Sequence, residues 1–146
     1  MNPSPCAGEN AKRVAEARAA GWSVLLADDA RDLQALIAKW LEEAGHRVTR
    51  VSTGREIVLH AAQTDFDLLV TDILMPDGDG WDAIAAVHRS RPQMRILAIS
   101  GGAREMPANT VLRAARAAGA IASLEKPFSR PDFLEAVTRV MATKPR

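Results

Sequence analysis

The chain has 146 residues, which favours a single domain large enough to bury a hydrophobic core. Its formal net charge of +1, hydrophobic fraction of 47% and lack of tyrosine argue against a nucleic-acid or membrane surface. Cys6 is the single cysteine and no apolar signal segment begins the chain, so we expect a cytoplasmic protein with no disulfide framework, nucleic-acid partner or membrane partner.

The N-terminal segment differs in composition from the rest of the chain. Residues 1–10 are rich in proline, serine, asparagine and glycine, which is typical of a disordered tail. Residues 11–20 are alanine-rich and charged, with Val14 as their one sizeable apolar anchor, and so short a helix is marginal in isolation. We therefore divide the chain into an N-terminal tail (1–20), disordered or forming a short extra helix, and one domain (21–146).

From Gly21 onward, short apolar runs alternate with helical patterns. The apolar runs predict five strands, at residues 23–27, 47–51, 67–71, 95–99 and 120–124. The first helix is predicted by an i, i+3, i+4 apolar pattern that comprises Leu33, Leu36, Ile37, Trp40 and Leu41. Four more helices are predicted by their end signals: the capping-box spacing of Thr53 and Glu56, the segment 81–89 before Pro92, the segment 110–118 before Gly119, and the N-cap Ser129.

Five strand–helix repeats with short connections predict an α/β fold with one parallel sheet covered by helices on both faces. We expect two helices on one face and three on the other. The runs 24–27, 68–71 and 96–99 should be nearly fully buried, because strands covered on both faces are continuously apolar. The residues after Lys126 are all needed by the last helix, so we expect no output domain.

Polar residues follow four of these strands at their carboxyl ends. Asp28-Asp29, Asp72, Ser100 and Lys126 would therefore meet at one edge of the sheet, where open α/β folds bind ligands. Taken singly, each has an ordinary explanation: an acidic pair before a helix is more often an N-cap, Ser100 is as well explained as a loop serine, and Lys126 as a surface lysine. Together they indicate a site for a divalent cation and a phosphoryl group.

Three carboxylates in one pocket need a cation or a proton. Like charges ~4 Å apart repel by about 4 kcal/mol at an effective dielectric constant near 20. Oxygen ligands without histidine or cysteine favour Mg²⁺ (or Mn²⁺). Mg²⁺ and Lys126 together would balance the three carboxylates.

Two other metal-site interpretations fail. The segment 77–82 does not fit a calcium loop, because Trp81 stands where an oxygen ligand is needed and Asp82 where glycine is needed. The three histidines, His46, His60 and His88, are scattered and are best interpreted as surface or helix-face residues.

The motifs Asp28-Asp29, Asp72-Ile-Leu-Met-Pro-Asp-Gly-Asp-Gly, Ser100 and Lys126-Pro127-Phe128, in this order and spacing, resemble a response-regulator receiver domain of two-component signalling. The resemblance covers residues 21–146 and is closest in kind to stand-alone, chemotaxis-type receivers. It implies a flavodoxin-like, doubly wound, five-stranded parallel sheet of strand order 2-1-3-4-5 with five helices. It also implies a signalling protein rather than an enzyme, with at most slow self-dephosphorylation.

The resemblance also implies the roles of the site residues. Asp72 would be the phosphoacceptor, phosphorylated by a sensor histidine kinase or a histidine phosphotransfer protein. Asp29, Asp72 and the backbone carbonyl of Leu74 would bind Mg²⁺, and Asp28 would hold a metal-bound water. Ser100 and Lys126 would contact the phosphoryl oxygens, and a cis Lys126–Pro127 bond would turn the lysine toward the pocket.

One position departs from the family pattern. Receivers usually carry tyrosine or phenylalanine three residues before the lysine, as part of a signalling switch with the hydroxyl residue, and here Ser123 stands there. We therefore expect Ser100 to act without an aromatic partner. Phosphorylation would reposition residues 101–110, and an unknown output protein would read this loop and the following helix.

Two alternatives remain open. A haloacid-dehalogenase-like phosphatase also uses a strand-end aspartate with Mg²⁺, but it needs a second aspartate two positions later, where this chain has Leu74. A degenerate receiver acting as a constitutive binding module is disfavoured by the intact acidic set. Phosphorylation of Asp72 would distinguish these alternatives.

Overall fold

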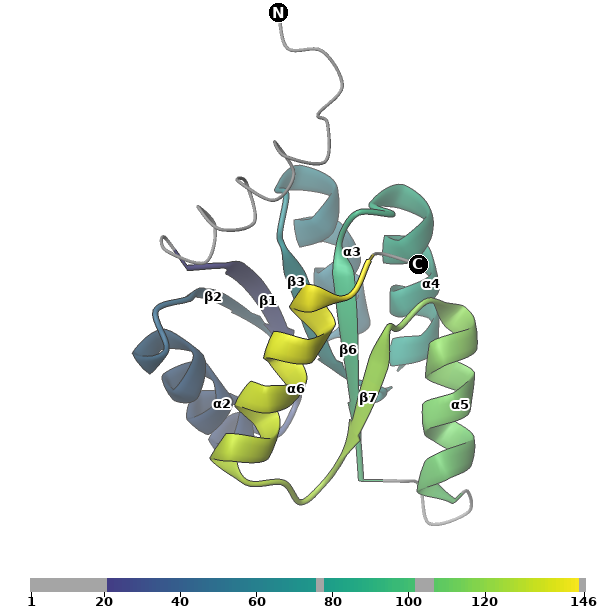
Figure 1. The fold of residues 1–146 in the computed structure, drawn as a ribbon. Coiled ribbons are helices and arrows are strands. Elements are labelled where there is room, and N and C mark those ends of the chain that lie inside the picture. The colour runs from purple at the N-terminus through teal and green to yellow at the C-terminus, as the bar shows by residue number, and fades with distance from the viewer. Residues whose placement is uncertain (1–20, 76–77, 102–106, 145–146) are drawn as a thin grey trace, which may run out of the picture.

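The computed structural model describes residues 21–75, 78–101 and 107–144 (Figure 1). The predicted tail 1–20 and residues 102–106 of the loop 101–110 therefore lie outside the described residues. The elements are β1 (Ser23–Ala27), α2 (Arg31–Glu43), β2 (Arg47–Val51), α3 (Gly54–Gln63), β3 (Leu68–Asp72), β4 (Leu74–Met75), β5 (Gly78–Asp79), α4 (Gly80–Ser90), β6 (Arg95–Ser100), α5 (Ala108–Ala118), β7 (Ala122–Glu125) and α6 (Arg130–Ala142).

Five strands form one parallel sheet in the order β2-β1-β3-β6-β7. When only the strands of this sheet are counted along the chain, the order is 2-1-3-4-5, which confirms the predicted flavodoxin-like fold class. The numbering differs because β4 and β5 pair with each other in a separate antiparallel sheet that we did not predict. This small sheet lies between β3 and α4 in sequence, directly after the edge that carries Asp72.

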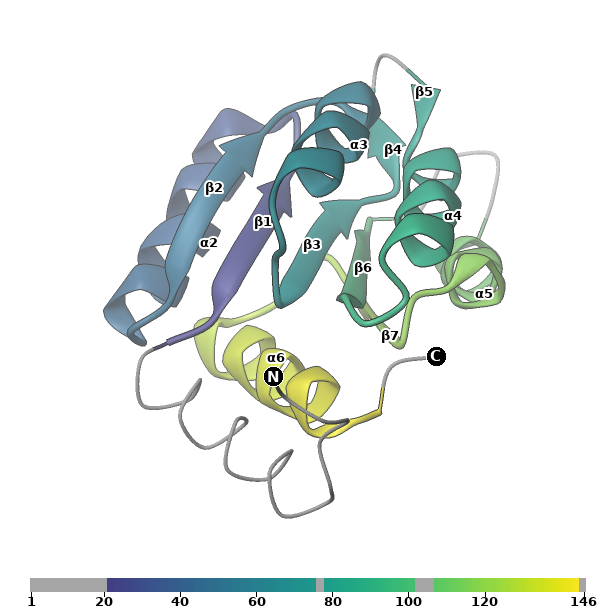
Figure 2. The ribbon, with the colours of Figure 1, turned by 90° about the horizontal axis from the view of Figure 1, so that it is seen from above.

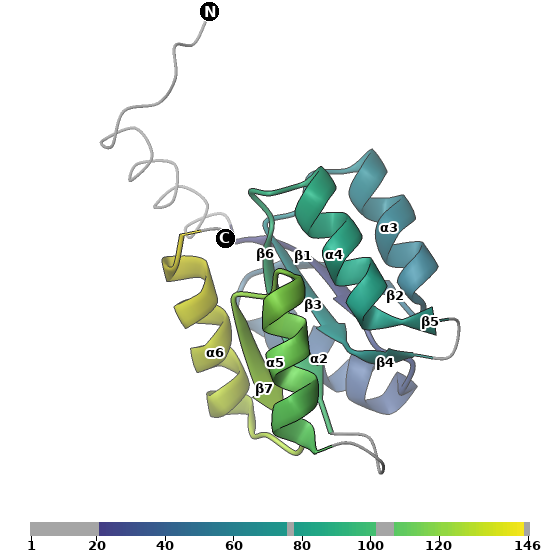
Figure 3. The ribbon, with the colours of Figure 1, turned by 90° about the vertical axis from the view of Figure 1, so that its right-hand side faces the viewer.

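Helices cover both faces of the sheet (Figures 2 and 3). One core lies between the sheet and α2 and α6, and contains Ile37 and Phe133. The other lies between the sheet and α3, α4 and α5, and contains Ile57 and Ile84. The predicted division of two helices and three helices is confirmed.

The central strands are buried as predicted. The side chains of residues 24–27, 68–71 and 96–99 are each no more than 1% exposed. Alternate residues of β1 face different cores: Leu25 belongs to the α3–α5 side, whereas Val24 and Leu26 belong to the α2–α6 side. Because both faces are covered, the carboxyl-terminal edge is where polar side chains of these strands can reach solvent.

The apolar stripe predicted for α2 is wrong in detail. Leu36 is 44% exposed, whereas the buried residues of this helix are Gln34, Ile37, Ala38 and Leu41. The helix is rotated so that a polar residue, Gln34, faces the sheet. Among the described helices, none is long and apolar enough to cross a membrane.

Candidate functional site

The sheet register brings the site residues together. In the pairing of β1 with β3, Ala27 lies opposite Thr71, so Asp28 and Asp72 leave neighbouring strands side by side. In the pairing of β6 with β7, Ser100 lies opposite Glu125, and Lys126 follows at once. The predicted convergence at one edge of the sheet is therefore present in the structure.

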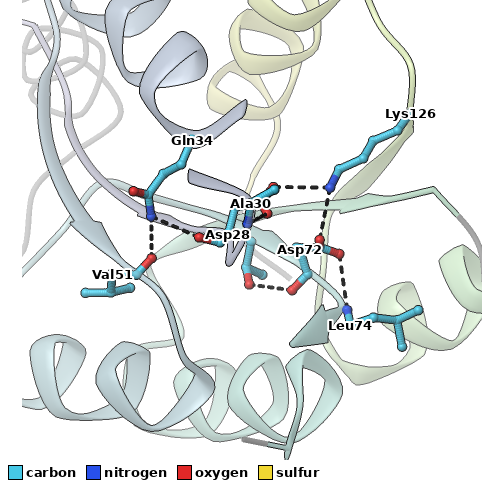
Figure 4. Close-up of polar contacts among 8 residues, drawn as sticks. Asp28, Ala30, Gln34, Val51, Asp72, Leu74 and Lys126 are labelled. Atoms are coloured by element: carbon cyan, nitrogen blue, oxygen red, sulfur yellow. Dashed lines mark hydrogen bonds and ion pairs between the residues drawn. The ribbon is translucent and has the colours of Figure 1, made fainter. Parts of the chain in front are cut away.

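Lys126 lies between two carboxylates (Figure 4). Its Nζ donates a hydrogen bond to Oδ2 of Asp72 at 3.0 Å and forms an ion pair with Oδ2 of Asp28 at 3.2 Å. The Lys126–Pro127 bond is cis, as predicted. The side chain of Lys126 is 22% exposed, whereas those of Asp28 and Asp72 are 2% and 10% exposed. The ammonium therefore faces two largely desolvated carboxylates.

Backbone amides hold the other oxygen of each carboxylate. The amide of Ala30 donates to Oδ1 of Asp28 at 2.9 Å, and the amide of Leu74 donates to Oδ1 of Asp72 at 3.1 Å. Ala30 is itself the N-cap of α2 and has no side-chain cap, so Asp28 orders the turn before the helix rather than capping its first turn. Each carboxylate is thus held by a backbone amide at Oδ1 and by the Lys126 ammonium at Oδ2.

The backbone after Asp72 is closely packed. The amide of Gly80 donates to the carbonyl of Ile73 at 2.5 Å, and a Cβ at Gly80 would lie 2.6 Å from the backbone oxygen of Asp72. No larger residue fits at position 80 without moving the end of β3. The Leu74 side chain is 38% exposed.

The two predicted switch residues lie on neighbouring strands. Ser100 is fully buried at the end of β6, and its carbonyl accepts a hydrogen bond from the amide of Lys126 at 2.9 Å. Ser123 lies opposite Ala98 in β7 and is half-buried. Ser100 therefore lies beside the lysine, whereas Ser123 lies two positions further from the edge.

The charges in the pocket do not balance. Burial raises the pKa of Asp72 and the charge of Asp28 raises it further, while the contacts with Lys126 and the Leu74 amide lower it. For Lys126, burial lowers the pKa, but the contacts with Asp72 and Asp28 outweigh burial and leave it raised. Three carboxylates against one ammonium leave a formal charge of −2 in this pocket.

The donor set fits a divalent cation. Oxygen atoms of Asp28, Asp29 and Asp72 lie within 4.8 Å of one another. Among the described residues, Oδ2 of Asp28 is buried without a hydrogen-bond partner, and its charge is met by the ion pair with Lys126. Oxygen-only ligands and a formal charge of −2 are the features that Mg²⁺ or Mn²⁺ would satisfy.

One polar residue near the site was not predicted. Gln34 is 5% exposed, and its side-chain nitrogen donates to the backbone carbonyl of Asp28 at 3.1 Å (Figure 4). In sequence it stands between apolar residues of a helix, where a glutamine normally faces solvent.

His46, which we predicted to be a surface or helix-face residue, is instead half-buried and stacks on Trp22 with ring centroids 4.8 Å apart.

The family model of the response regulator receiver domain matches residues 24–138 of this chain. The response regulator receiver protein CpdR of Brucella abortus is 31% identical over 120 residues, which cover 81% of this chain and 95% of CpdR. The DNA-binding transcriptional regulator NtrC of Azospirillum brasilense is 31% identical over 121 residues, which cover 82% of this chain but 24% of NtrC. The chain thus spans about a quarter of the length of the NtrC relatives it matches.

Solved structures agree with this match. The chemotaxis protein CheY4 of Vibrio cholerae superposes with a TM-score of 0.73 at 28% identity, covering 83% of this chain and 99% of CheY4. The receiver domain of the sensor histidine kinase PA1611 of Pseudomonas aeruginosa superposes with a TM-score of 0.74 at 25% identity, covering 85% and 100% of the two chains. That receiver domain has a magnesium ion coordinated in its active-site cleft.

Proposed function

Because the chain belongs to the response regulator receiver domain family, we propose that it accepts a phosphoryl group on Asp72 in two-component or phosphorelay signalling. The donor would be a sensor histidine kinase or a histidine phosphotransfer protein. The phosphorylated protein would signal by binding an output protein or by onward phosphotransfer. We propose residues 21–146 as the receiver domain and the cytoplasm as its location.

One observation carries this proposal: Asp28, Asp29, Asp72 and Lys126 meet at one point on the sheet edge. A transferred phosphoryl group needs positioning and charge stabilisation more than covalent assistance. A carboxylate nucleophile beside an ammonium and an acidic cation site supplies both.

The proposed reaction forms a bond between a carboxylate oxygen of Asp72 and phosphorus. The bond between phosphorus and the donor's imidazole nitrogen breaks, and its electron pair stays on that nitrogen. Lys126 would exchange its contact with Asp72 for one with a phosphoryl oxygen, and the Ser100 hydroxyl would bind a second oxygen. Mg²⁺ held by Asp29, Asp72 and the Leu74 carbonyl, with Asp28 acting through water, would offset the negative charge of the carboxylates and the incoming group.

Intact mass after incubation with a small acyl phosphate tests the proposal. The wild-type protein should gain one phosphoryl group in the presence of Mg²⁺ and none in the presence of a chelator. Asp72→Asn should gain none because it lacks the nucleophile, and Asp29→Ala should gain none because it lacks a metal ligand. Asp32→Asn, an exposed acidic position in the first turn of α2, is the matched control and should react like the wild type.

Two outcomes would contradict this assignment. Labelling that persists in Asp72→Asn would place the acceptor elsewhere. A wild-type protein that stays unmodified with Mg²⁺ present would instead support a constitutive binding module. The exposed Leu74 keeps a dehalogenase-type phosphatase disfavoured, because no carboxyl group is present there to act as the second aspartate.

A further inference from the structure

The amide of Gln34 contacts three separate groups at the end of the sheet, and Figure 4 shows its contacts with Asp28 and Val51. Its Nε2 donates to the carbonyl of Asp28 at 3.1 Å and to the carbonyl of Val51 at 2.6 Å. Its Oε1 accepts a hydrogen bond from Nε of Arg50 at 3.0 Å. The contacts therefore join α2 to the ends of both β1 and β2.

These contacts use the whole donor capacity of the amide in one orientation. A primary amide nitrogen has two hydrogens, and here two carbonyls receive them. A guanidinium can only donate, so Arg50 requires that the amide oxygen points toward it. Arg50 thereby fixes which end of the Gln34 amide faces the two strand ends, and an inverted amide would break all three of these hydrogen bonds.

The same network immobilises the peptide units on both sides of Asp28. The amide of Asp28 donates to the carbonyl of Val51 at 3.3 Å, and its carbonyl accepts from Gln34. With Oδ1 of Asp28 held by the amide of Ala30, the residue is held through its amide, its carbonyl and its side chain. Asp29 follows directly in the chain, so its position depends on the same turn.

We propose that Gln34, oriented by Arg50, is a positioning residue that sets the affinity of the acidic cluster for Mg²⁺. This inference rests on the proposed function, since it concerns the metal of the phosphorylation site. Groups that orient metal ligands through hydrogen bonds typically change metal affinity or activity by about 10–100-fold when they are removed.

Charge and positioning predict opposite results for two substitutions. Gln34→Glu has nearly the same shape but adds a negative charge, and Arg50→Ala removes a positive charge. By electrostatics alone, each change would tighten binding of a cation to the nearby acidic cluster. If the network positions the ligands, each change weakens binding instead, because the carbonyls of Asp28 and Val51 lose a correctly oriented donor.

Titration calorimetry of the full chain with MgCl₂ measures the effect directly. We expect the dissociation constant for Mg²⁺ to rise by about tenfold or more in Gln34→Glu and Gln34→Leu. Arg50→Ala, at an exposed position, should raise it by about two- to tenfold, the equivalent of one hydrogen bond. Saturating Mg²⁺ should restore phosphorylation in these variants, because the nucleophile and the metal ligands are all still present.

Two controls separate positioning from general destabilisation. Gln63→Leu makes the same substitution at an exposed position of α3 and should leave the dissociation constant unchanged. Arg91→Ala removes side-chain hydrogen bonds to Ala61 and Ala62 at the opposite end of the sheet, before β6 begins, and should lower stability without changing Mg²⁺ affinity.

Each result either supports or overturns the inference. Unchanged or tighter Mg²⁺ binding in Gln34→Glu and Arg50→Ala, with normal phosphorylation of the wild type, would overturn this inference and leave the proposed function intact. If Arg91→Ala weakened Mg²⁺ binding as much as Gln34→Leu, lower stability alone would explain the effect, and the inference would also be overturned. A wild-type protein that binds no Mg²⁺ would overturn both proposals.

Discussion

Replacing Lys126 by methionine removes the one positive charge that contacts both buried carboxylates in the described structure. Methionine keeps an unbranched apolar chain of similar length, so the change mainly deletes the ammonium. Without it, the carboxylates of Asp28 and Asp72 are left close together with no cation between them.

The distances set the size of the expected effect. At an effective dielectric constant of about 20, unit charges 3.0 Å apart attract by about 5.5 kcal/mol, and the 3.2 Å pair adds a similar amount. Desolvation of the ammonium offsets much of this gross attraction. Protonation of one carboxyl also limits the loss, because a neutral carboxyl no longer repels the other carboxylate. We therefore expect Lys126→Met to lose about 2–4 kcal/mol of unfolding free energy near neutral pH.

The loss should depend on pH. Burial already raises the pKa of Asp72 above its usual value of 3.8, and without Lys126 only the Leu74 amide still opposes burial and the charge of Asp28. A carboxyl with a raised folded-state pKa holds its proton longer in the folded state than in the unfolded chain. Stability is therefore highest below the usual pKa and falls as the pH rises through the raised one. The difference between variant and wild type should be small near pH 4 and largest near pH 7.

Urea unfolding followed by tryptophan fluorescence, with a chelator present, measures this difference. Lys39→Met, an exposed position on α2, is the matched control and should stay within about 0.5 kcal/mol of the wild type. The reasoning would be refuted if Lys126→Met matched the wild type at neutral pH. It would also be refuted if the loss were equal at both pH values, because the effect would then be one of packing rather than charge.

Two further predictions concern stability away from the site. Gly119→Ala should lose more than about 2 kcal/mol of unfolding free energy, because a Cβ there would lie 2.6 Å from Cγ of His88 at a φ of +138°. Gly45→Ala, with a φ of +97° but open space around it, should lose only about 1 kcal/mol in the same urea titration, and equal losses would contradict the steric argument. Burial lowers the pKa of His46, whose Nδ1 accepts from the amide of Trp22 at 3.1 Å, so the unfolded chain binds more protons and stability should fall as the pH drops through 6.5. His46→Phe should lose this part of the pH dependence between about pH 8 and about pH 5.5, and an unchanged slope would assign it to other groups.

The sequence predicts the fold well because the central strands are continuously apolar. In the runs 24–27, 68–71 and 96–99, side chains on both sides of each strand are apolar, so helices must cover both faces of the sheet to exclude water. The ends of elements are less predictable. The run predicted at 120–124 pairs only from Ala122, since register with Leu97 decides where β7 begins. The strands β4 and β5 have two residues each, which is too short for any periodic pattern.

The sequence likewise predicts some residues of the candidate site and misses others. Asp28, Asp72 and Lys126 could be placed from sequence because strand ends in a parallel sheet must share an edge. Gln34 could not, because the rotation of α2 about its axis, and not its apolar pattern, turns this residue toward the sheet while Leu36 faces solvent. Arg50, the partner of Gln34, lies on strand β2, and only the three-dimensional contact reveals why a polar residue of α2 is buried there.

The unbalanced charge in the pocket links its occupancy to stability. The formal charge of −2 opposes folding when no cation is present, and a ligand that binds only the folded state stabilises it in proportion to the logarithm of its concentration. Gln34 and Arg50 hold Asp28 in place against this repulsion through neutral carbonyl contacts that leave the carboxylate oxygens free of additional donors. Because these contacts are made to the backbone, they order the turn without neutralising the carboxylates. The repulsion among the carboxylates is then offset by the cation proposed for this site rather than by other groups of the fold.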